Sequence, residues 1–385
     1  MNIEFFAEVM AEICAHSSAA PQRPLRWVVI ANPRAGGFVM RSRWKKCRLA
    51  LEESRIAARA NPLREDCAPA STASKFGAAP VLAACGLVPT ERPGSAEEIT
   101  KVLVGEIQAN TAPFYLLITA GGDGTSLEAL SILYQAPDSV RSNVAVLRLP
   151  LGTGNDGADS PDLAAALGLL LKPSRIEFSP ALRLITQPIT VSPQKPHDDT
   201  IADSHIHSTK GPFLAFNILS VGLDAFVTHM TNKMKGKLPG DFYKLWVDIA
   251  SLLYDKLYTV GFLDVRASNG QGEKTFREKV LLLAVGVSGH RTYGSQKKIL
   301  PDDRNVCVLR QMPLLRKLAL KGLFNTGKHI DKPEAVLFNA RRVEISGEYP
   351  ILAQMDGEAV LLQREDFPIV IELTKPVIPV FRGSL

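Results

Sequence analysis

A glycine-rich turn between a predicted strand and a predicted helix constrains the fold of this chain most. The apolar run at 114–119 leads into Ala120-Gly-Gly-Asp-Gly-Thr125, and residues 126–133 follow with a helical pattern. Such a turn directs backbone N–H groups and the positive end of a helix dipole toward one point, which suits a phosphate. Asp123 would repel a phosphate unless it held a cation or fixed the turn. An ordinary strand-to-helix turn without a ligand is the alternative.

Length and composition describe an ordinary globular chain with a mild positive charge. The 385 residues suffice for about two or three domains, and 46% hydrophobic with 22% charged residues allow a sizeable core. The net charge of +6 is compatible with anionic small molecules or an anionic membrane surface. It is too diffuse for nucleic acid, which requires a concentrated basic stripe, so we expect no nucleic-acid partner.

The cysteines and the N-terminus indicate the compartment. Five cysteines without a Cys-x-x-Cys pair are expected to be reduced and mostly buried: Cys14, Cys47, Cys67, Cys85 and Cys307. Residues 1–20 lack Lys and Arg and carry Glu4, Glu8 and Glu12, which disfavours a signal peptide and predicts a short helix. No run reaches the roughly 18 apolar residues of a membrane span. We therefore expect a cytoplasmic protein with peripheral membrane association.

Residues 25–175 alternate between strand-like and helix-like patterns, which predicts a doubly wound, mostly parallel α/β domain. Ser95 and Glu98 have the spacing of a capping box at the start of one helix. Residues 61–86 are rich in Ala, Pro and Ser and are interpreted as an insertion. Strands are expected at 25–31, 114–119 and 144–149, and helices at 41–60, 95–107, 126–133 and 161–171.

Short strand-like runs dominate after residue 175 and predict a second domain that is similar to a β-sandwich. We thus expect an N-terminal extension at 1–24, an α/β domain at 25–175 and a β-rich domain at 176–385, whose last strand could return to the first domain. The runs lie at 176–178, 182–191, 213–219, 257–266, 279–287, 305–311, 335–346, 349–355, 358–362 and 369–373, with a helix at 241–255 and a polar loop at 194–211.

Two further turns follow predicted strands. Asn32-Pro-Arg-Ala-Gly-Gly37 ends the first strand, and Pro150-Leu-Gly-Thr-Gly-Asn-Asp156 ends another. Open α/β sheets bind ligands at such strand ends. Residues 152–157 also fit Gly-x-Gly-x-x-Gly, but this turn comes late in the domain and would set Asp156 beside a pyrophosphate, which disfavours a dehydrogenase. The chain has no Walker-type Gly-x-x-x-x-Gly-Lys-Ser/Thr sequence.

The three turns, in this order, resemble the diacylglycerol kinase catalytic superfamily of lipid kinases, which shares its fold with NAD kinases. Phe216-Asn-Ile-Leu-Ser-Val-Gly-Leu-Asp-Ala225 resembles the family's entry into its second domain. Gln354-Met-Asp-Gly-Glu358 resembles its C-terminal Asp-Gly-Glu motif. The resemblance extends from Trp27 to the C-terminus, and it implies a nucleotide-binding first domain and a lipid-binding second domain.

The resemblance also implies roles for individual residues. Glu358 would be the general base that takes a proton from a lipid hydroxyl, a role that favours a partly buried carboxylate. Asp123 would help to order Mg²⁺, which prefers oxygen ligands. ATP would be bound by residues of the turns and by one threonine upstream of the 95–107 helix: Asn32, Pro33, Arg34, Gly36, Gly37, Thr90, Gly121, Gly122, Gly124, Thr125, Gly152, Thr153 and Asn155.

The chain departs from the family at a second metal site. The family usually has an Asp-Asp-Gly-x-Leu-Asp-like turn, part of which holds Mg²⁺. Here Arg304 stands at the glycine position and Cys307 at the later acidic position. Asp302 and Asp303 remain as candidate metal ligands, and Arg304 could supply a cation in place of the ion.

Three polar stretches have ordinary alternatives. His197, His205 and His207 lie near aspartates and could bind Zn²⁺, but a solvated loop is favoured. Residues 233–246 mix lysines with aromatics and could contact anionic headgroups, although a loop leading into a packed helix is favoured. Residues 316–321 are interpreted as the solvated face of a helix.

These observations predict an ATP- and Mg²⁺-dependent lipid kinase. Its substrate would be the hydroxyl of a diacylglycerol-like or sphingoid lipid, and a homodimer is left open. Two alternatives stay open as well. One is an NAD kinase, which shares the Gly-Gly-Asp-Gly turn. The other is a catalytically weak lipid- or nucleotide-binding protein, an alternative suggested by Arg304 and Cys307 in place of the family's metal-binding residues.

Overall fold

The computed structural model describes residues 2–65, 85–152, 154–187, 213–234, 254–294 and 297–383. The chain divides into two compact units, one of Met1–Pro180 with Lys375–Leu385 and one of Ala181–Thr374. The boundary thus falls after residue 180 instead of 175, because residues 174–179 pair with the sheet of the first unit. Several sequence-based expectations lie outside the described residues: Cys67, Thr153, most of the 61–86 insertion, the 194–211 loop with its histidines, and most of the 233–255 region.

The first unit is an α/β unit built on a mostly parallel sheet with the strand order β2-β1-β3-β4-β19-β5. Only β5 runs antiparallel to its neighbour. The predicted fold class is confirmed here. The elements are α1 Asn2–Ala15, β1 Leu25–Ala31, α2 Gly36–Val39, α3 Arg41–Ala58, β2 Cys85–Pro89, α4 Ser95–Ala109, β3 Phe114–Gly121, α5 Asp123–Gln135, α6 Asp138–Arg141, β4 Val144–Pro150, α7 Leu163–Leu171, β5 Ser174–Ser179 and β19 Ile378–Gly383.

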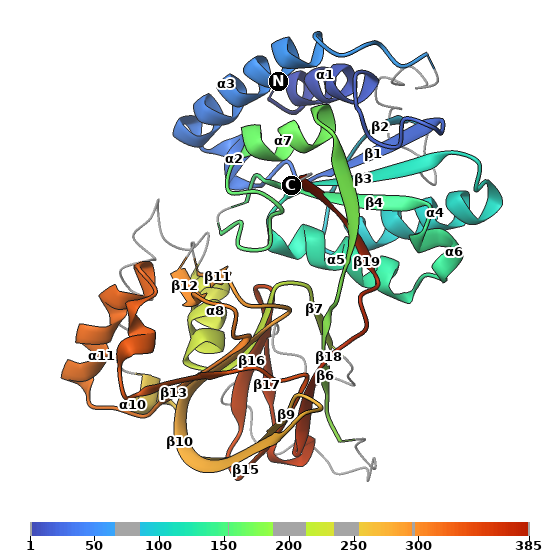
Figure 1. The fold of residues 1–385 in the computed structure, drawn as a ribbon. Coiled ribbons are helices and arrows are strands. Elements are labelled where there is room, and N and C mark those ends of the chain that lie inside the picture. The colour runs from blue at the N-terminus through green and yellow to red at the C-terminus, as the bar shows by residue number, and fades with distance from the viewer. Residues whose placement is uncertain are drawn as a thin grey trace. The chain divides into compact units, whose positions relative to one another are not determined.

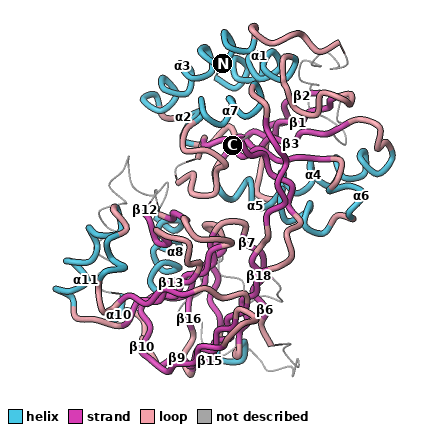
Figure 2. Tube along the Cα trace, in the orientation of Figure 1, coloured by secondary structure: helices cyan, strands magenta, loops and turns pink. Residues whose placement is uncertain are grey.

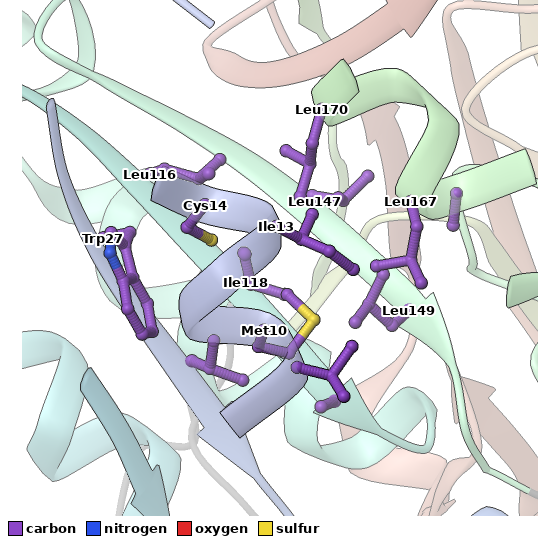
Figure 3. Packing of buried hydrophobic residues seen from close by; sticks show 14 of the residues in the cluster. Met10, Ile13, Cys14, Trp27, Leu116, Ile118, Leu147, Leu149, Leu167 and Leu170 are labelled. Atoms are coloured by element: carbon purple, nitrogen blue, oxygen red, sulfur yellow. The ribbon is translucent and has the colours of Figure 1, made fainter. Parts of the chain in front are cut away.

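Helices cover both faces of this sheet, with α1, α3 and α7 on one side and α4, α5 and α6 on the other (Figure 1). The central strands β1, β3 and β4 are mostly apolar, because a parallel sheet covered on both faces buries nearly all of their residues. Figure 3 shows Met10 and Ile13 of α1 packed against sheet residues and against Leu167 and Leu170 of α7. The helix at 2–15 is therefore part of the core of this unit and not an extension.

The capping box predicted at Ser95 and Glu98 is absent. The hydroxyl of Ser95 accepts the backbone N–H groups of Glu91 and Arg92, and the carboxylate of Glu98 pairs with the Arg92 side chain. The start of α4 is capped from another helix, because the carboxylate of Glu128 in α5 accepts the N–H groups of Gly94 and Ala96 at 2.9 and 3.1 Å. A long-range acceptor has replaced the local one.

The second unit is dominated by strands, drawn in magenta in Figure 2, and they pair in antiparallel fashion. The long strand β10 pairs with β9 along its first half and with β8 and β13 along its second, so it belongs to both sheet segments. The elements are β6 Leu182–Ile185, β7 Phe213–Ala215, β8 Ile218–Gly222, α8 Leu223–Met234, α10 Tyr254–Leu257, β9 Phe262–Ser268, β10 Glu273–Gly286, β11 Arg291–Tyr293, β12 Lys297–Leu300, β13 Val306–Arg310, α11 Leu314–Lys321, η1 Gly322–Asn325, η2 Lys328–Asp331, β14 Ala335–Phe338, β15 Arg342–Gly347, β16 Ile351–Met355, β17 Glu358–Leu362, η3 Arg364–Asp366 and β18 Ile369–Leu373.

Two predicted strands are each split in the structure. Residues 213–219 form β7 and β8, because the backbone N–H groups at 216–218 bond to the side chain of Asp356 and not to a neighbouring strand. Residues 335–346 form β14 and β15, separated where Asn305 bonds both the N–H and the C=O of Ala340. In both places a buried polar side chain takes the hydrogen bonds that would have continued a ladder.

Candidate functional site

The first two glycine turns meet at the point where the strand order of the first unit reverses. The chain runs from β1 to β2 on one side and then returns to β3 on the other side of β1. The backbone N–H of Asn32, just after β1, donates to the C=O of Ala120 at 2.9 Å. A Cβ placed on Gly121 would lie 3.2 Å from the Cβ of Asn32. Open α/β sheets bind ligands at such a switch point, beyond the carboxyl ends of the strands.

The third turn packs directly on the other two. A Cβ placed on Gly152 would overlap the Cα of Gly122, so the two turns approach backbone to backbone. The N–H of Gly37 donates to the C=O of Leu151 at 2.8 Å, and a Cβ on Gly37 would lie 2.9 Å from that oxygen. Glycine is required at these positions because any side chain would separate the turns.

Asp123 fixes the third turn. It is the first residue of α5, and its carboxylate Oδ1 accepts the backbone N–H of Gly157 at 3.0 Å. Its other oxygen Oδ2 and Oδ2 of Asp156 lie 3.2 and 3.0 Å from one Cβ position built on Gly154. Two carboxylates from different turns therefore converge on one glycine. This oxygen-rich donor set suits Mg²⁺, which proteins hold through one or two carboxylates together with substrate phosphates.

Asn155 has an unusual conformation. Its φ angle is +59°, in the left-handed region, where Asn is tolerated better than most residues. Its Oδ1 atom is buried and has no hydrogen-bond partner in the described part of the chain. A buried acceptor without a donor carries a free-energy cost, and it is typical of a position that a ligand completes.

The remaining turn residues predicted to bind ATP lie at the same edge of the sheet. The N–H of Thr90, which follows β2, donates to the C=O of Ala31 at 2.7 Å. Oδ1 of Asn32 accepts the N–H of Arg34 at 2.9 Å, so part of the Asn32 amide shapes its own turn. Pro33 is half-buried and Arg34 is exposed, Gly36 and Gly37 open α2, and Gly124 and the buried Thr125 lie in the first turn of α5.

Sequence reasoning missed two charged groups beside the turns. Arg43 of α3 donates from Nη1 to the C=O of Gly152 at 3.1 Å, which brings a cation to the third turn. Asp156 was considered only as an obstacle to pyrophosphate, whereas it faces Gly154 together with Asp123. The sequence feature that could have indicated Arg43 is its position near the start of α3, shortly after the turn at 32–37.

A buried ion cluster anchors the end of the third turn. The carboxylate of Asp159 has no exposed surface, and it pairs with Arg148 of β4 at 2.8 Å and with Arg382 of β19 at 3.1 Å. Burial acts to raise the pKa of this carboxyl, but the two guanidinium charges and the hydrogen bonds from Arg148 hold it below its ordinary value. The cluster connects the turn to two neighbouring strands.

The two motifs that sequence analysis placed in the second unit are joined by one carboxylate. Asp356 is buried and accepts the backbone N–H groups of Phe216, Asn217 and Ile218, the last two at 3.1 and 3.0 Å. Asp356 and Gly357 both have positive φ angles, as in a type I′ turn, and they join β16 to β17. The Asp-Gly-Glu motif is thus a tight hairpin turn fastened to residues 216–218.

Glu358 stands at the start of β17, opposite Met355. Its side chain is exposed. The partial burial expected for a general base is therefore not found in the structure. The predicted base role stays a prediction.

The second unit also contains an apolar cavity of about 120 Å³. Asp224 of α8 is the acidic residue of its lining, and its Oδ2 accepts the hydroxyl of Ser220 at 2.7 Å and the amide of Gln354 at 3.4 Å. Mostly apolar cavities with a few polar groups are typical binding sites for small molecules. The lining residues come from α8, β10, β11, β12, β13, α11, η1 and nearby turns: Leu223, Asp224, Val227, Leu281, Leu282, Tyr293, Gly294, Lys297, Ile299, Leu309, Met312, Lys317, Leu320, Lys321 and Phe324.

Arg304, which stands at the glycine position of the family's metal-binding turn, contacts Asp302 in the structure. The Arg304 guanidinium pairs with the Asp302 carboxylate through both Nε and Nη2 and holds the pKa of Asp302 below its ordinary value. Asp303 is exposed and lies 2.9 Å from Nε2 of His290. Among the described residues, no group of three or more His, Cys, Asp or Glu side chains is placed to hold a metal ion. The metal role of Asp302 and Asp303 stays a prediction, with Arg304 as the cation that Asp302 contacts.

The α/β unit with its phosphate-type turns and the antiparallel second unit together define a fold of the diacylglycerol kinase type. Residues 26–173 match the model of the diacylglycerol kinase catalytic domain, so this part of the chain is similar to that domain. No curated protein matches the chain.

Solved structures agree in fold. Two from Bacillus anthracis str. Sterne, each described as "a putative diacylglycerol kinase", are both 15% identical to this chain. One has a TM-score of 0.55 and covers 92% of this chain and 94% of its own. The other has a TM-score of 0.51, with 92% and 96% covered. At this identity the likeness concerns the fold alone. In the described part of the chain, no helix combines the length and apolar character that crossing a bilayer requires.

Proposed function

We propose that this protein is an ATP- and Mg²⁺-dependent lipid kinase that phosphorylates the hydroxyl of a diacylglycerol-like or sphingoid lipid. The observation that carries the proposal is the convergence of three glycine turns at the β1/β3 switch point of a diacylglycerol kinase catalytic domain. The apolar cavity of the second unit supports a lipid as the acceptor, because its walls suit an acyl or alkyl chain.

The phosphates of ATP would lie against the backbone of the three turns. Positive charge is available there from Arg43 and from the N-terminus of α5. Asp123 and Asp156 would hold Mg²⁺, and this ion would neutralise charge on the β- and γ-phosphates. Because Asp123 also fixes the Gly157 turn, its carboxylate has both a structural and a metal-binding task.

In the proposed reaction, the lipid oxygen bonds to the γ-phosphorus while the bond from that phosphorus to the β,γ-bridging oxygen breaks. The proton of the lipid hydroxyl passes to the carboxylate of Glu358, and ADP leaves with the bridging oxygen. The exposed position of Glu358 at the tip of the β16–β17 hairpin leaves its carboxylate accessible to a substrate. Asp224 would accept a hydrogen bond from the polar head of a lipid in the cavity.

The test is transfer of labelled phosphate from ATP to purified lipids in detergent, with diacylglycerol, monoacylglycerol and sphingosine as separate acceptors. We expect label in at least one lipid product, and we expect chelation of Mg²⁺ to abolish it. Glu358→Gln should reduce turnover at least about 100-fold while the Kd for ATP changes little. Glu365→Gln, an exposed glutamate of the same unit, is the matched control and should keep full activity.

Each failure has a distinct meaning. Full activity in Glu358→Gln would remove the base assignment and leave the kinase proposal intact. Formation of NADP from NAD and ATP, with no labelled lipid, would establish the NAD kinase alternative. Tight binding of ATP without transfer to any acceptor would establish the catalytically weak alternative.

A further inference from the structure

The short helix α11 in the second unit has its polarity reversed. A surface helix usually turns leucines inward and lysines outward. Here Lys317 is buried, whereas Leu314, Leu315 and Leu318 are 45%, 80% and 47% exposed. The sequence pattern at 316–321 predicted the solvated face of a helix, whereas in the structure leucines occupy the exposed face of α11.

Specific contacts hold this orientation. Nζ of the buried Lys317 lies 2.6 Å from Oδ1 of Asp255, and Arg316 pairs with Glu334 at 2.5 Å. On the same inward side, Leu320 packs with Phe226 and other buried residues of one hydrophobic cluster. Turning the leucines inward would remove Lys317 from its ion pair, so their exposure is built into the fold.

The exposed residues form one apolar strip. Leu314 and Leu318 are one helical turn apart, as are Leu315 and Leu318, and Ala319 and Gly322 continue the same exposed side. Other exposed aliphatic residues of the described chain are spread more widely, for example Leu49 and Ile56 of α3. A concentrated exposed apolar patch is typical of an interaction surface.

The charge around the strip is positive. Between Leu314 and Lys332 the chain carries five cations and one acidic residue, Asp331. Arg316 and Lys317 are paired with Glu334 and Asp255, so the excess positive charge comes from Lys321, Lys328 and Lys332. Leucines flanked by lysines are typical of helices that lie in the headgroup region of anionic membranes. The same segment contributes Leu320, Lys321 and Phe324 to the wall of the apolar cavity.

We propose that the outward face of α11, made of Leu314, Leu315 and Leu318, docks on the surface of an anionic lipid bilayer. The leucines would enter the boundary between headgroups and acyl chains, and the nearby lysines would contact anionic headgroups. Docking there brings the bilayer next to the wall of the cavity, which would let a lipid pass into the cavity directly. This last consequence rests on the proposed lipid kinase function, whereas docking itself requires no phosphoryl transfer.

The test is sedimentation of the full chain with vesicles of phosphatidylcholine, with and without phosphatidylserine. Wild type should bind the vesicles with phosphatidylserine more tightly and release them as salt rises. The Leu315→Asp, Leu318→Asp double variant should bind at least about tenfold more weakly, because binding scales with the apolar area inserted. Lys328→Gln should weaken binding about fivefold. Leu49→Asp, at a position 58% exposed in the first unit, is the matched control and should bind like wild type.

A variant that should bind vesicles more tightly tests the same surface without relying on a loss of binding, which unfolding could also cause. Leu315→Trp should strengthen vesicle binding, because tryptophan favours the membrane interface, and its fluorescence should shift to the blue on vesicles. Unchanged binding in the double variant, or an equal loss in Leu49→Asp, would overturn the proposal. So would a dimer of wild type that becomes a monomer in the double variant while vesicle binding stays the same, since the strip would then join two copies of the chain.

Activity in detergent separates this proposal from the proposed function. The double variant should phosphorylate detergent-dispersed lipid like wild type, because neither leucine lines the cavity. Vesicle binding without any kinase activity would support docking and remove the kinase function. Kinase activity of wild type in detergent without vesicle binding would support the kinase function and remove the docking proposal.

Discussion

Replacing Asp159 by asparagine tests whether the buried ion cluster holds the third glycine turn. The carboxylate is fully buried and contacts Arg148 and Arg382, so Asp159→Asn keeps the shape of the side chain but removes the charge that both guanidinium groups require. Breaking a buried ion pair on one side costs about 3–5 kcal/mol. For a unit of this size that corresponds to a melting temperature lower by roughly 6–20 °C.

The effect should depend on pH in a defined direction. The pKa of Asp159 in the folded chain lies below its ordinary value of 3.8, so the folded state binds fewer protons than the unfolded state. The stabilisation is therefore fully present above that ordinary value and is lost as the pH falls through the lower folded pKa. The difference in unfolding free energy between wild type and Asp159→Asn should be constant near neutrality and shrink below pH 3.8.

Urea unfolding at several pH values, followed by circular dichroism, measures this difference. Asp138→Asn is the matched control, because Asp138 pairs with Arg141 but is 94% exposed, and such pairs contribute little. Titration of ATP should in addition show weaker binding by Asp159→Asn at a temperature where it is folded. Equal stability of the two variants, or a difference that grows as the pH falls, would refute the reasoning.

Three further predictions concern single positions. Gly152→Ala should weaken ATP binding at least about tenfold in calorimetric titration, because the added carbon overlaps Gly122 and separates two turns, whereas Gly105→Ala in α4, where nothing lies within 4 Å, should not weaken it. Asp356→Ala should lower the unfolding free energy by roughly 2–4 kcal/mol in urea, because three buried N–H groups lose their acceptor, and unchanged stability would contradict the role of this carboxylate. The Cys307 thiol should resist a thiol reagent at pH 8 until the chain is unfolded, since burial raises its pKa to about 12, and rapid labelling of Cys307 in the folded chain, read by mass spectrometry, would contradict this.

Local patterns were sufficient where the structure depends on near neighbours in sequence. The apolar runs at 25–31, 114–119 and 144–149 predicted β1, β3 and β4 almost to the residue, because strands buried on both faces must be apolar throughout. The glycines predicted the three turns, because the close approach of their backbones leaves no room for side chains. The capping box failed because two Glu128 oxygens, from a different helix, take the N–H groups at the start of α4.

Long-range contacts determined what the patterns left open. The sequence pattern does not explain why Asp123 lies in a phosphate-type turn. The fold shows that its carboxylate accepts the N–H of Gly157 and faces Asp156. The sequence located the Asp-Gly-Glu motif but could not show that Asp356 fastens it to residues 216–218. Both contacts join positions far apart in the chain, so no local pattern encodes them.

The sequence by itself determined the fold class and the order of the motifs, because these follow from local chemistry and periodicity. It also predicted the kind of ligand that the glycine turns suit. The tertiary structure alone decided which carboxylates meet, that Arg304 accompanies Asp302, and that the leucines of α11 point outward. The physical reason is the same in each case. The orientation of a side chain depends on its contacts with distant segments. Here Lys317 pairs with Asp255 and Arg316 with Glu334, and this orientation of α11 leaves its leucines at the surface.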